Sequence, residues 1–112
     1  MRYGIGGGES LRPAYALDEI KAKVSAGDYY PTGAVRRVLA KHDWDESDVE
    51  ACVAGLSPSD FDKSQPHKTR RGVRLDIYKP IYEDIGLYVK FVIDEDGKTI
   101  VVLDFCEDGE FH

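Results

Sequence analysis

The chain has few cysteines, no long apolar run and no excess of positive charge. Its two cysteines, Cys52 and Cys106, stand singly in apolar surroundings without C-x-x-C spacing, so we interpret both as small core residues in a reducing compartment. No window approaches the roughly 18 apolar residues of a membrane span. The N-terminus also lacks the basic region and apolar run of a secretion signal. The sequence therefore predicts a cytoplasmic protein without a membrane partner.

Positive charge is scarce overall and concentrated in one segment. The 112-residue chain has a formal net charge of -6 and 42% hydrophobic residues, which fits one globular domain with a single core. Between residues 63 and 79 six cations accompany one acid, giving +5, so the rest of the chain sums to -11. The overall acidity argues against a general polyanion binder, whereas a local cationic patch can still hold phosphates.

The two ends differ in composition from the part between them. Residues 1–13 are rich in glycine but lack the Gly-Lys-Ser/Thr ending of a phosphate-binding loop, so we expect a flexible tail. Residues 108–112 form a short acidic tail. We predict a single domain over residues 14–107.

Three helices are predicted in the N-terminal half. Apolar residues recur at helical spacing over residues 17–24. Thr32 can cap a second helix, and Asp45 followed by Asp48 has the capping-box pattern of a third. Residues 28–31 are interpreted as a connection, because their final proline favours extended geometry in the residue before it.

Alternating residues predict strands in the C-terminal half. One strand covers residues 73–78, and an Asp-Gly turn joins two more at 87–93 and 99–105 as a hairpin. Residues 65–72 contain no apolar side chain and predict an exposed, mobile loop. The expected fold class is α+β, with N-terminal helices packed on a small antiparallel sheet of three or four strands.

The candidate functional residues lie on and beside these strands. Because side chains alternate, Tyr88 and Lys90 project from one face, where we expect them beside Arg74 and Tyr78. Lys63 and the basic loop complete a cationic concavity. The candidate nucleic-acid-binding residues are Arg70, Arg71, Arg74, Lys90, His67 and Lys68. Such a site suits a phosphodiester, and single-stranded RNA offers bases to stack on tyrosines. An ordinary solubilising sheet face is the open alternative.

Several segments resemble the MqsR family of toxin–antitoxin mRNA interferases. They are GLSPSDFDKS at residues 55–64, LDIYKP at 75–80 and LYVK at 87–90, with a weaker match at 17–27. The resemblance implies a RelE-like toxin fold and a metal-independent endoribonuclease that cleaves mRNA, typically at GCU-like sites, and so inhibits translation and growth. It implies no cofactor, and it implies a cognate antitoxin as partner.

The resemblance also implies roles for particular residues. Lys63 and Tyr88 match functional positions of the family and are the expected catalytic residues, whereas Leu75 replaces a family glutamine and the region of Cys106 lacks a family lysine. We expect attack by the RNA 2′-OH, with Tyr88 acting at the 2′-oxygen and Lys63 at the phosphorane or the leaving oxygen. Both side chains ordinarily titrate near about 10, so the surrounding cations would have to lower their pKa values.

Three other interpretations stay open from the sequence. His67 has a natural pKa suited to acid–base catalysis and is the second choice for that role. The residues at Leu75 and Cys106, together with the net charge, favour a non-catalytic RelE-like module that docks a partner protein or ribosome. A metal-dependent nuclease has little support, because no carboxylate pair stands beside a histidine at ligand spacing.

Overall fold

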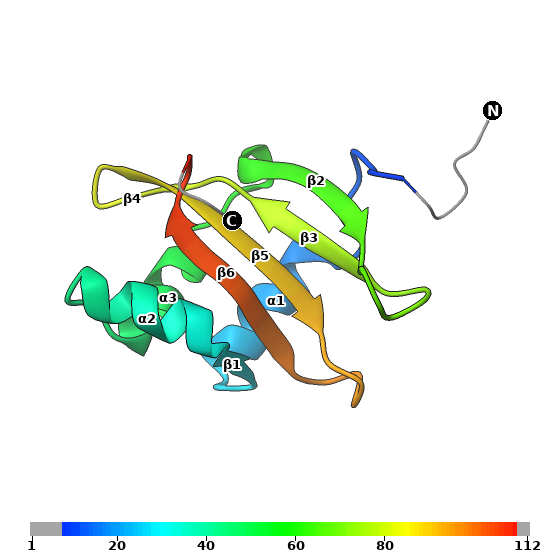
Figure 1. Ribbon diagram of the computed structural model, residues 1–112, viewed down its shortest axis with the longest axis horizontal. Helices are drawn as coiled ribbons and strands as arrows, with labels where there is room; N and C mark the ends of the chain where they lie inside the picture. Colours follow the sequence, from blue (N-terminus) through cyan, green and yellow to red (C-terminus); the bar gives the residue numbers. More distant parts are fainter. Residues whose placement is uncertain (1–7, 110–112) are drawn as a thin grey trace.

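All three helices and one short strand lie in the first half of the described chain, and the other strands follow (Figure 1). The computed structural model describes residues 8–109. Its helices are α1 (Leu17–Ser25), α2 (Gly33–Lys41) and α3 (Glu46–Ala54), with a single 3-10 turn at Pro58–Asp60. Its strands are β1 (Tyr29–Pro31), β2 (Phe61–Pro66), β3 (Arg74–Tyr78), β4 (Ile81–Tyr82), β5 (Ile85–Ile93) and β6 (Ile100–Glu107). The predicted α+β class is confirmed.

The sheet is larger than predicted and is mixed rather than antiparallel. Over the described residues its order is β1-β6-β5-β3-β2, and β4 pairs with the start of β5. The interpretation of residues 28–31 as a connection was wrong, because Tyr29 to Pro31 pair in parallel with β6. An edge position tolerates a proline, which has no N–H to donate. Three residues are too few for an alternating pattern to show in the sequence.

Helices α2 and α3 begin at the predicted side-chain caps. The Thr32 hydroxyl accepts a hydrogen bond from the Val35 N–H. Asp45 and Asp48 form a capping box: the Asp45 carboxylate accepts the N–H of Ser47, and the Asp48 carboxylate accepts the N–H of Asp45. These caps satisfy N–H groups that have no partner within the helix.

Two hairpins shape β5. The predicted β5–β6 hairpin is confirmed, and Asp96 closes its turn by accepting hydrogen bonds from Lys98 and Thr99. The β4–β5 hairpin was not predicted. Its turn residues Glu83 and Asp84 have φ angles of 50° and 67°, the left-handed geometry of a two-residue hairpin turn. Because Glu-Asp lacks the glycine typical of such turns, this hairpin could not be predicted from its residues.

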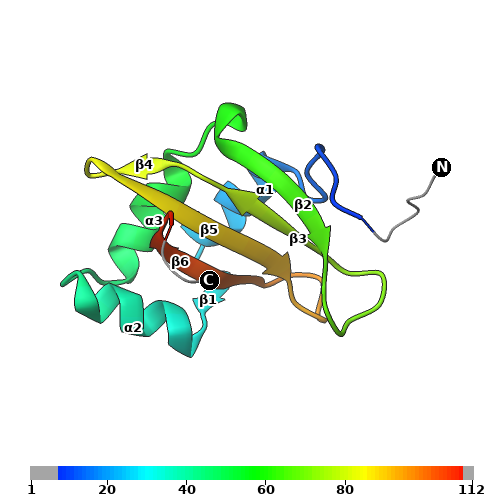
Figure 2. The same cartoon turned by 45° about the horizontal axis from the view of Figure 1, so that its top comes forward.

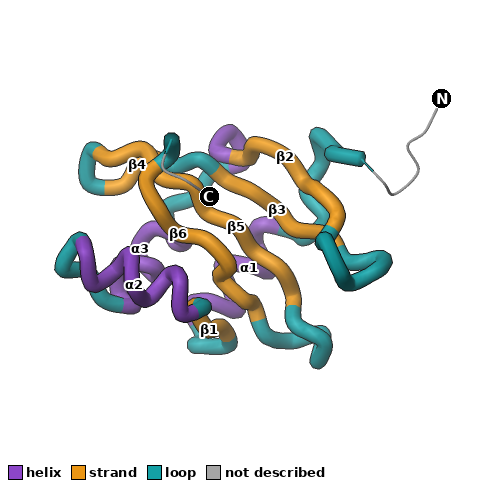
Figure 3. Tube along the Cα trace, in the orientation of Figure 1, coloured by secondary structure: helices purple, strands orange, loops and turns teal. Residues whose placement is uncertain are grey.

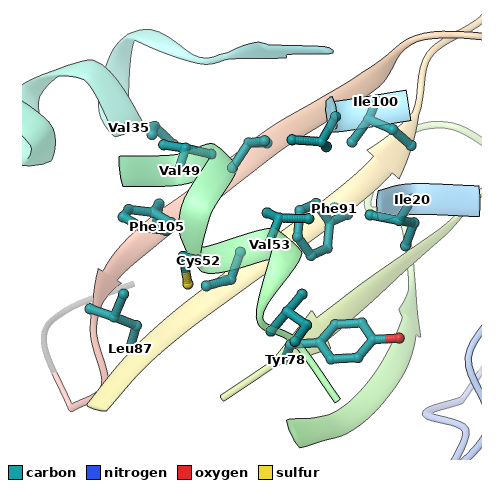
Figure 4. Close-up of a cluster of buried hydrophobic side chains, with 14 of the residues drawn as sticks. Ile20, Val35, Val49, Cys52, Val53, Tyr78, Leu87, Phe91, Ile100 and Phe105 are labelled. Atoms are coloured by element: carbon teal, nitrogen blue, oxygen red, sulfur yellow. The ribbon is translucent and has the colours of Figure 1, made fainter. Parts of the chain in front are cut away.

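The main core lies between one face of the sheet and the helices (Figure 4). From the helices it contains Ile20, Val24, Val35, Leu39, Val49, Cys52 and Val53. From the strands it contains Tyr78, Leu87, Val89, Phe91, Ile100, Val102 and Phe105. Cys52 and Cys106 are both free and buried, in agreement with the prediction, and burial raises the pKa of the Cys52 thiol to about 12.

The opposite face of the sheet, here called the open face, is contacted by a helix only at the β6 edge among the described residues. Figures 1 and 2 show α1 behind β5, and Figure 3 shows α2 and α3 together beside the β6 edge of the sheet. Helix α2 lies along the β6 edge, where Val38 contacts a small cluster of Ile77, Tyr88 and Cys106. A second cluster on the open face contains Leu75, Val92 and Val101.

The predicted face assignment of β3 was wrong. Ile77 pairs with Lys90 and therefore shares the open face, whereas Tyr78 is buried in the main core between Phe61 and Phe91. Arg74 lies four residues before Tyr78 in β3, so its side chain is also on the helix side of the sheet. Neither residue stands beside Tyr88. Strand β3 is buried on both faces, so its apolar and polar residues do not separate into an inner and an outer set.

The N-terminal segment is attached to the sheet from residue 8 onward. Ser10 pairs with Ser64 of β2 through two backbone hydrogen bonds of 2.7 and 2.9 Å. The buried carboxylate of Asp76 accepts the N–H groups of Ala14 and Tyr15 at 2.9 and 3.0 Å. Of the predicted flexible tail, residues 1–7 lie outside the described residues, and residues 8–10 contact β2 and β3.

Candidate nucleic-acid interface

A row of four paired residues, three of them charged, crosses the open face. Strand pairing sets Lys63 opposite Ile77, Ile77 opposite Lys90, and Lys90 opposite Asp104. Neighbouring strands lie about 4.8 Å apart, so the backbones of Lys63 and Lys90 are roughly 10 Å from each other. The two ammonium groups thus flank a common strip of the sheet.

Two irregularities in strand pairing create this row. The register shifts between Phe61 and Lys63, which leaves Asp62 as an extra residue and turns Lys63 to the open face. It shifts again beside Lys90, so that Asp104 rather than Leu103 stands opposite Lys90. The Lys90 ammonium consequently lies 3.2 Å from the Asp104 carboxylate. Bulges of this kind often re-aim side chains at functional sites.

Tyr88 lies two residues before Lys90 on the same face of β5. Its side chain is buried beside Ile77 and Cys106, and the Lys90 ammonium is 5.7 Å from the centre of its ring. Burial raises the pKa of the Tyr88 hydroxyl, and the positive charges of Lys90 and Lys63 offset only part of that rise. Tyr88 therefore keeps its proton at neutral pH.

Lys63 is paired with an acid from the N-terminal segment. Its ammonium donates to the Glu9 carboxylate at 2.9 Å, and this hydrogen bond raises the pKa of Lys63. The lowered pKa values that the expected mechanism would require of Lys63 and Tyr88 are not found, because a hydrogen bond to Glu9 raises the pKa of Lys63 and burial raises that of Tyr88. Both groups are proton donors near pH 7, and neither is a base.

His67 follows β2 and is held by its own loop. Its Nδ1 accepts the N–H groups of Thr69 and Arg70, both at 3.1 Å. In the neutral ring the proton consequently sits on Nε2, which can only donate. His67 is therefore placed as a hydrogen-bond donor, and accepting a proton at Nδ1 would break the two loop contacts.

Two pockets lie next to the row and share His67 and Lys68. The first, of about 410 Å³, is lined by residues 66–74 and contains the side chains of Lys68, Arg70, Arg71 and Arg74. The second, of about 250 Å³, is lined by Gln65, His67, Lys68, Leu75, Lys90 and Leu103. The structure thus brings the predicted cations together around two adjoining pockets.

Arg74 has structural contacts that its neighbours in the basic loop lack. Its guanidinium donates to the Ser64 hydroxyl at 3.2 Å, to the Ser64 carbonyl at 3.0 Å and to the Gly8 carbonyl at 2.6 Å. These bonds fasten the N-terminal segment to β2. Arg74 is therefore occupied in holding the fold, although it also lines the first pocket.

Three residues beside the site were missed from the sequence. Gln65 belongs to β2 rather than to a loop, so Lys63, Gln65 and His67 follow one another at every second position toward the open face. That alternation was a usable signal. Asp104 and Glu9 had no signal, because their places depend on a strand bulge and on contact between distant segments.

The family comparison agrees with the fold and covers every strand of the site. No helix within residues 8–109 is long and apolar enough to cross a membrane, and no curated protein matches the chain. A family model described as motility quorum-sensing regulator, toxin of MqsA, matches residues 12–107. The α+β arrangement of helices on a mixed sheet is consistent with a RelE-like toxin. The chain therefore belongs to the MqsR toxin family and is the toxin of a toxin–antitoxin pair, with a cognate antitoxin as its partner.

Proposed function

We propose that the protein is an endoribonuclease that cleaves mRNA in the cytoplasm at preferred sequences and so inhibits translation and growth. The observation that carries the proposal is the placement of Lys63, Tyr88 and Lys90 on one open sheet face. Two ammonium groups and a protonated phenol complement the charge that gathers on a phosphate during displacement at phosphorus. The basic loop adds further cations for the RNA backbone.

The reaction needs no metal or cofactor in this proposal, because the nucleophile is part of the substrate. The 2′-oxygen bonds to the adjacent phosphorus, the bond from phosphorus to the 5′-oxygen breaks, and the products are a 2′,3′-cyclic phosphate and a 5′-OH. Lys63 donates a proton to the leaving 5′-oxygen, and Tyr88 donates a hydrogen bond to a phosphoryl oxygen. Both roles suit groups whose pKa values are raised.

The 2′-OH proton requires an acceptor other than Lys63 or Tyr88. We assign this role to Asp104, whose carboxylate lies on the open face 3.2 Å from the Lys90 ammonium and whose charge acts on Tyr88. The contact with the Lys90 ammonium orients the carboxylate. The proposal thus assigns the base to a residue that the sequence did not suggest.

The test is cleavage of a long single-stranded RNA in the presence of a chelator. The wild type yields products with 5′-OH ends, and Lys63→Ala and Tyr88→Phe each lower the rate by roughly 10²–10⁴-fold. Tyr78→Phe is the matched control, because it removes the same hydroxyl from a tyrosine in the main core. Lys98→Ala removes the same charge as Lys63→Ala from the exposed β5–β6 turn.

An intact RNA with folded wild-type protein would contradict cleavage of free RNA. Repeating the assay with translating ribosomes then separates a ribosome-dependent ribonuclease from a binding module that only docks a partner. The pairing of Lys63 with Glu9 is the observation that favours the second candidate, since it occupies the expected catalytic ammonium.

A further inference from the structure

The second pocket of the open face is lined by neither of the two proposed catalytic residues, Lys63 and Tyr88. Leu75 and Leu103 give the 250 Å³ pocket apolar walls, and polar or cationic side chains complete its lining. Its volume is below the roughly 300–1,000 Å³ of sites for drug-sized ligands. A single planar ring system therefore fits the pocket better than several linked groups.

Gln65 gives this pocket a hydrogen-bonding group that occurs nowhere else in the chain. The sequence has one glutamine and no asparagine, so Gln65 carries the only side-chain amide. It pairs with Leu75 across β2 and β3, and it lies two residues beyond Lys63, a distance of about 7 Å along the strand. Within residues 8–109 its amide makes no hydrogen bond.

The pocket lies between two surfaces that carry positive charge. On one side lie Lys63 and Tyr88, and on the other the 410 Å³ pocket begins at His67 and Lys68. An RNA strand that passes from the first surface to the second has its intervening base beside Gln65. Apolar walls suit the flat faces of a base, and an amide suits its edge.

We propose that this pocket binds one nucleobase next to the phosphate held at Lys63, and that Gln65 determines which base is preferred. The inference rests on the proposed ribonuclease function and adds a specificity-determining residue to it. The amide offers two N–H donors and one carbonyl acceptor. A base with the complementary edge satisfies them, whereas a mismatched base leaves buried polar groups unpaired.

The test measures binding to 2′-O-methyl RNA, which cannot undergo attack by a 2′-OH. Oligonucleotides that differ in one base are compared at each position by fluorescence anisotropy. The wild type prefers one base at one position by about 10-fold, the size of a good two-bond contact between an amide and a base. Gln65→Met keeps the length of the side chain and reduces this preference to about 2-fold.

A second variant gives a directional result. Gln65→Glu replaces the amide by a carboxylate that can only accept hydrogen bonds. The preference then moves toward guanine, because its N1–H and N2–H₂ groups present two adjacent donors. A loss of stability in β2 would not produce a new base preference. If both variants keep the wild-type preference at every position, the inference is wrong.

The inference and the proposed function fail in different ways. Base discrimination on 2′-O-methyl RNA, without cleavage of ordinary RNA either free or on translating ribosomes, leaves the base pocket standing and contradicts the ribonuclease. Cleavage by Gln65→Met with the full wild-type base preference leaves the ribonuclease standing and contradicts the base pocket. No discrimination by the wild type at any position contradicts the base pocket as well.

Discussion

Glu9 and Lys63 form an ion pair of 2.9 Å between the N-terminal segment and β2. Glu9 lies before the start of the family match at residue 12, whereas Lys63 is the expected catalytic lysine. The backbone pairing of Ser10 with Ser64 holds the acid in place. A segment outside the matched region therefore pairs with the ammonium that, in the proposed function, acts on the RNA.

Glu9→Gln is expected to increase RNA binding and cleavage. An exposed ion pair contributes roughly 0.2–1 kcal/mol, so its loss corresponds to a gain of about 1.4- to fivefold. Because Glu9 raises the pKa of Lys63, the variant also loses activity at a lower alkaline pH than the wild type. The measurement is a pH–rate profile on single-stranded RNA. Glu19→Gln removes the same charge from α1 and should leave the profile unchanged. An equal gain in cleavage by Glu19→Gln would show that the net charge, and not the ion pair with Lys63, causes the effect.

Local signals in the sequence predicted the elements whose causes are local. The caps at Thr32 and Asp45 and the turn at Asp96 each depend on side chains within three residues of the groups they bind. These patterns carry their own physical reason, which is the satisfaction of backbone N–H groups. The hairpin and helix starts could therefore be predicted without knowledge of the fold.

The site could be predicted only in part, because its geometry depends on distant contacts. The alternation along β5 correctly placed Tyr88 and Lys90 on one face. For β3 the same argument failed, since Asp76 is polar and yet buried, with partners near residue 15. The two register shifts beside Lys63 and Lys90 leave no trace in a single sequence. Both decide which residues meet.

Asp76→Ala is expected to destabilise the protein strongly. The substitution leaves the N–H groups of Ala14 and Tyr15 without their carboxylate acceptor in a buried place. Hydrogen bonds to a charged group contribute about 1.5–3 kcal/mol each, so loss of the two should lower the free energy of unfolding by about 3–6 kcal/mol. Urea denaturation measures it. Asp76→Asn retains one acceptor oxygen and should lose less; equal losses would show that the charge matters more than the hydrogen bonds.

Arg71→Ala is expected to weaken RNA binding without changing base preference. Arg71 is exposed on the rim of the first pocket, where a contact to phosphate carries no sequence information. The slope of log K against log salt should decrease by about 0.7 for one lost phosphate contact on a single strand. Arg36→Ala on α2 is the control, because Arg36 lines neither pocket. A changed base preference in Arg71→Ala would contradict the assignment.

Tyr78 is expected to contribute to a loss of stability at alkaline pH. Burial and the Asp76 charge raise its pKa to about 12 in the folded protein, compared with about 10 in an unfolded chain. Its contribution is complete below about pH 10 and disappears as the pH rises toward 12, because the unfolded chain ionises first. Near pH 11, Tyr78→Phe should lose about 1 kcal/mol less than the wild type relative to pH 8. Equal losses would place the titration elsewhere.

Asp104→Asn separates the proposed base from the residues that bind RNA. Asparagine keeps the shape of the side chain and a hydrogen bond to solvent or substrate, but it cannot take the 2′-OH proton. The cleavage rate should fall by roughly 10²–10⁴-fold, while the affinity for uncleavable 2′-O-methyl RNA is unchanged or higher, since one negative charge has left the face. Asp62→Asn is the matched control. Asp62 also raises the pKa of Tyr88, but it pairs with Lys79 at 4.0 Å and not with Lys90. A larger loss of cleavage rate in Asp62→Asn than in Asp104→Asn would assign the base to Asp62 in the β2 bulge. If neither variant loses rate, solvent hydroxide removes the proton, and the cleavage rate then rises continuously with pH.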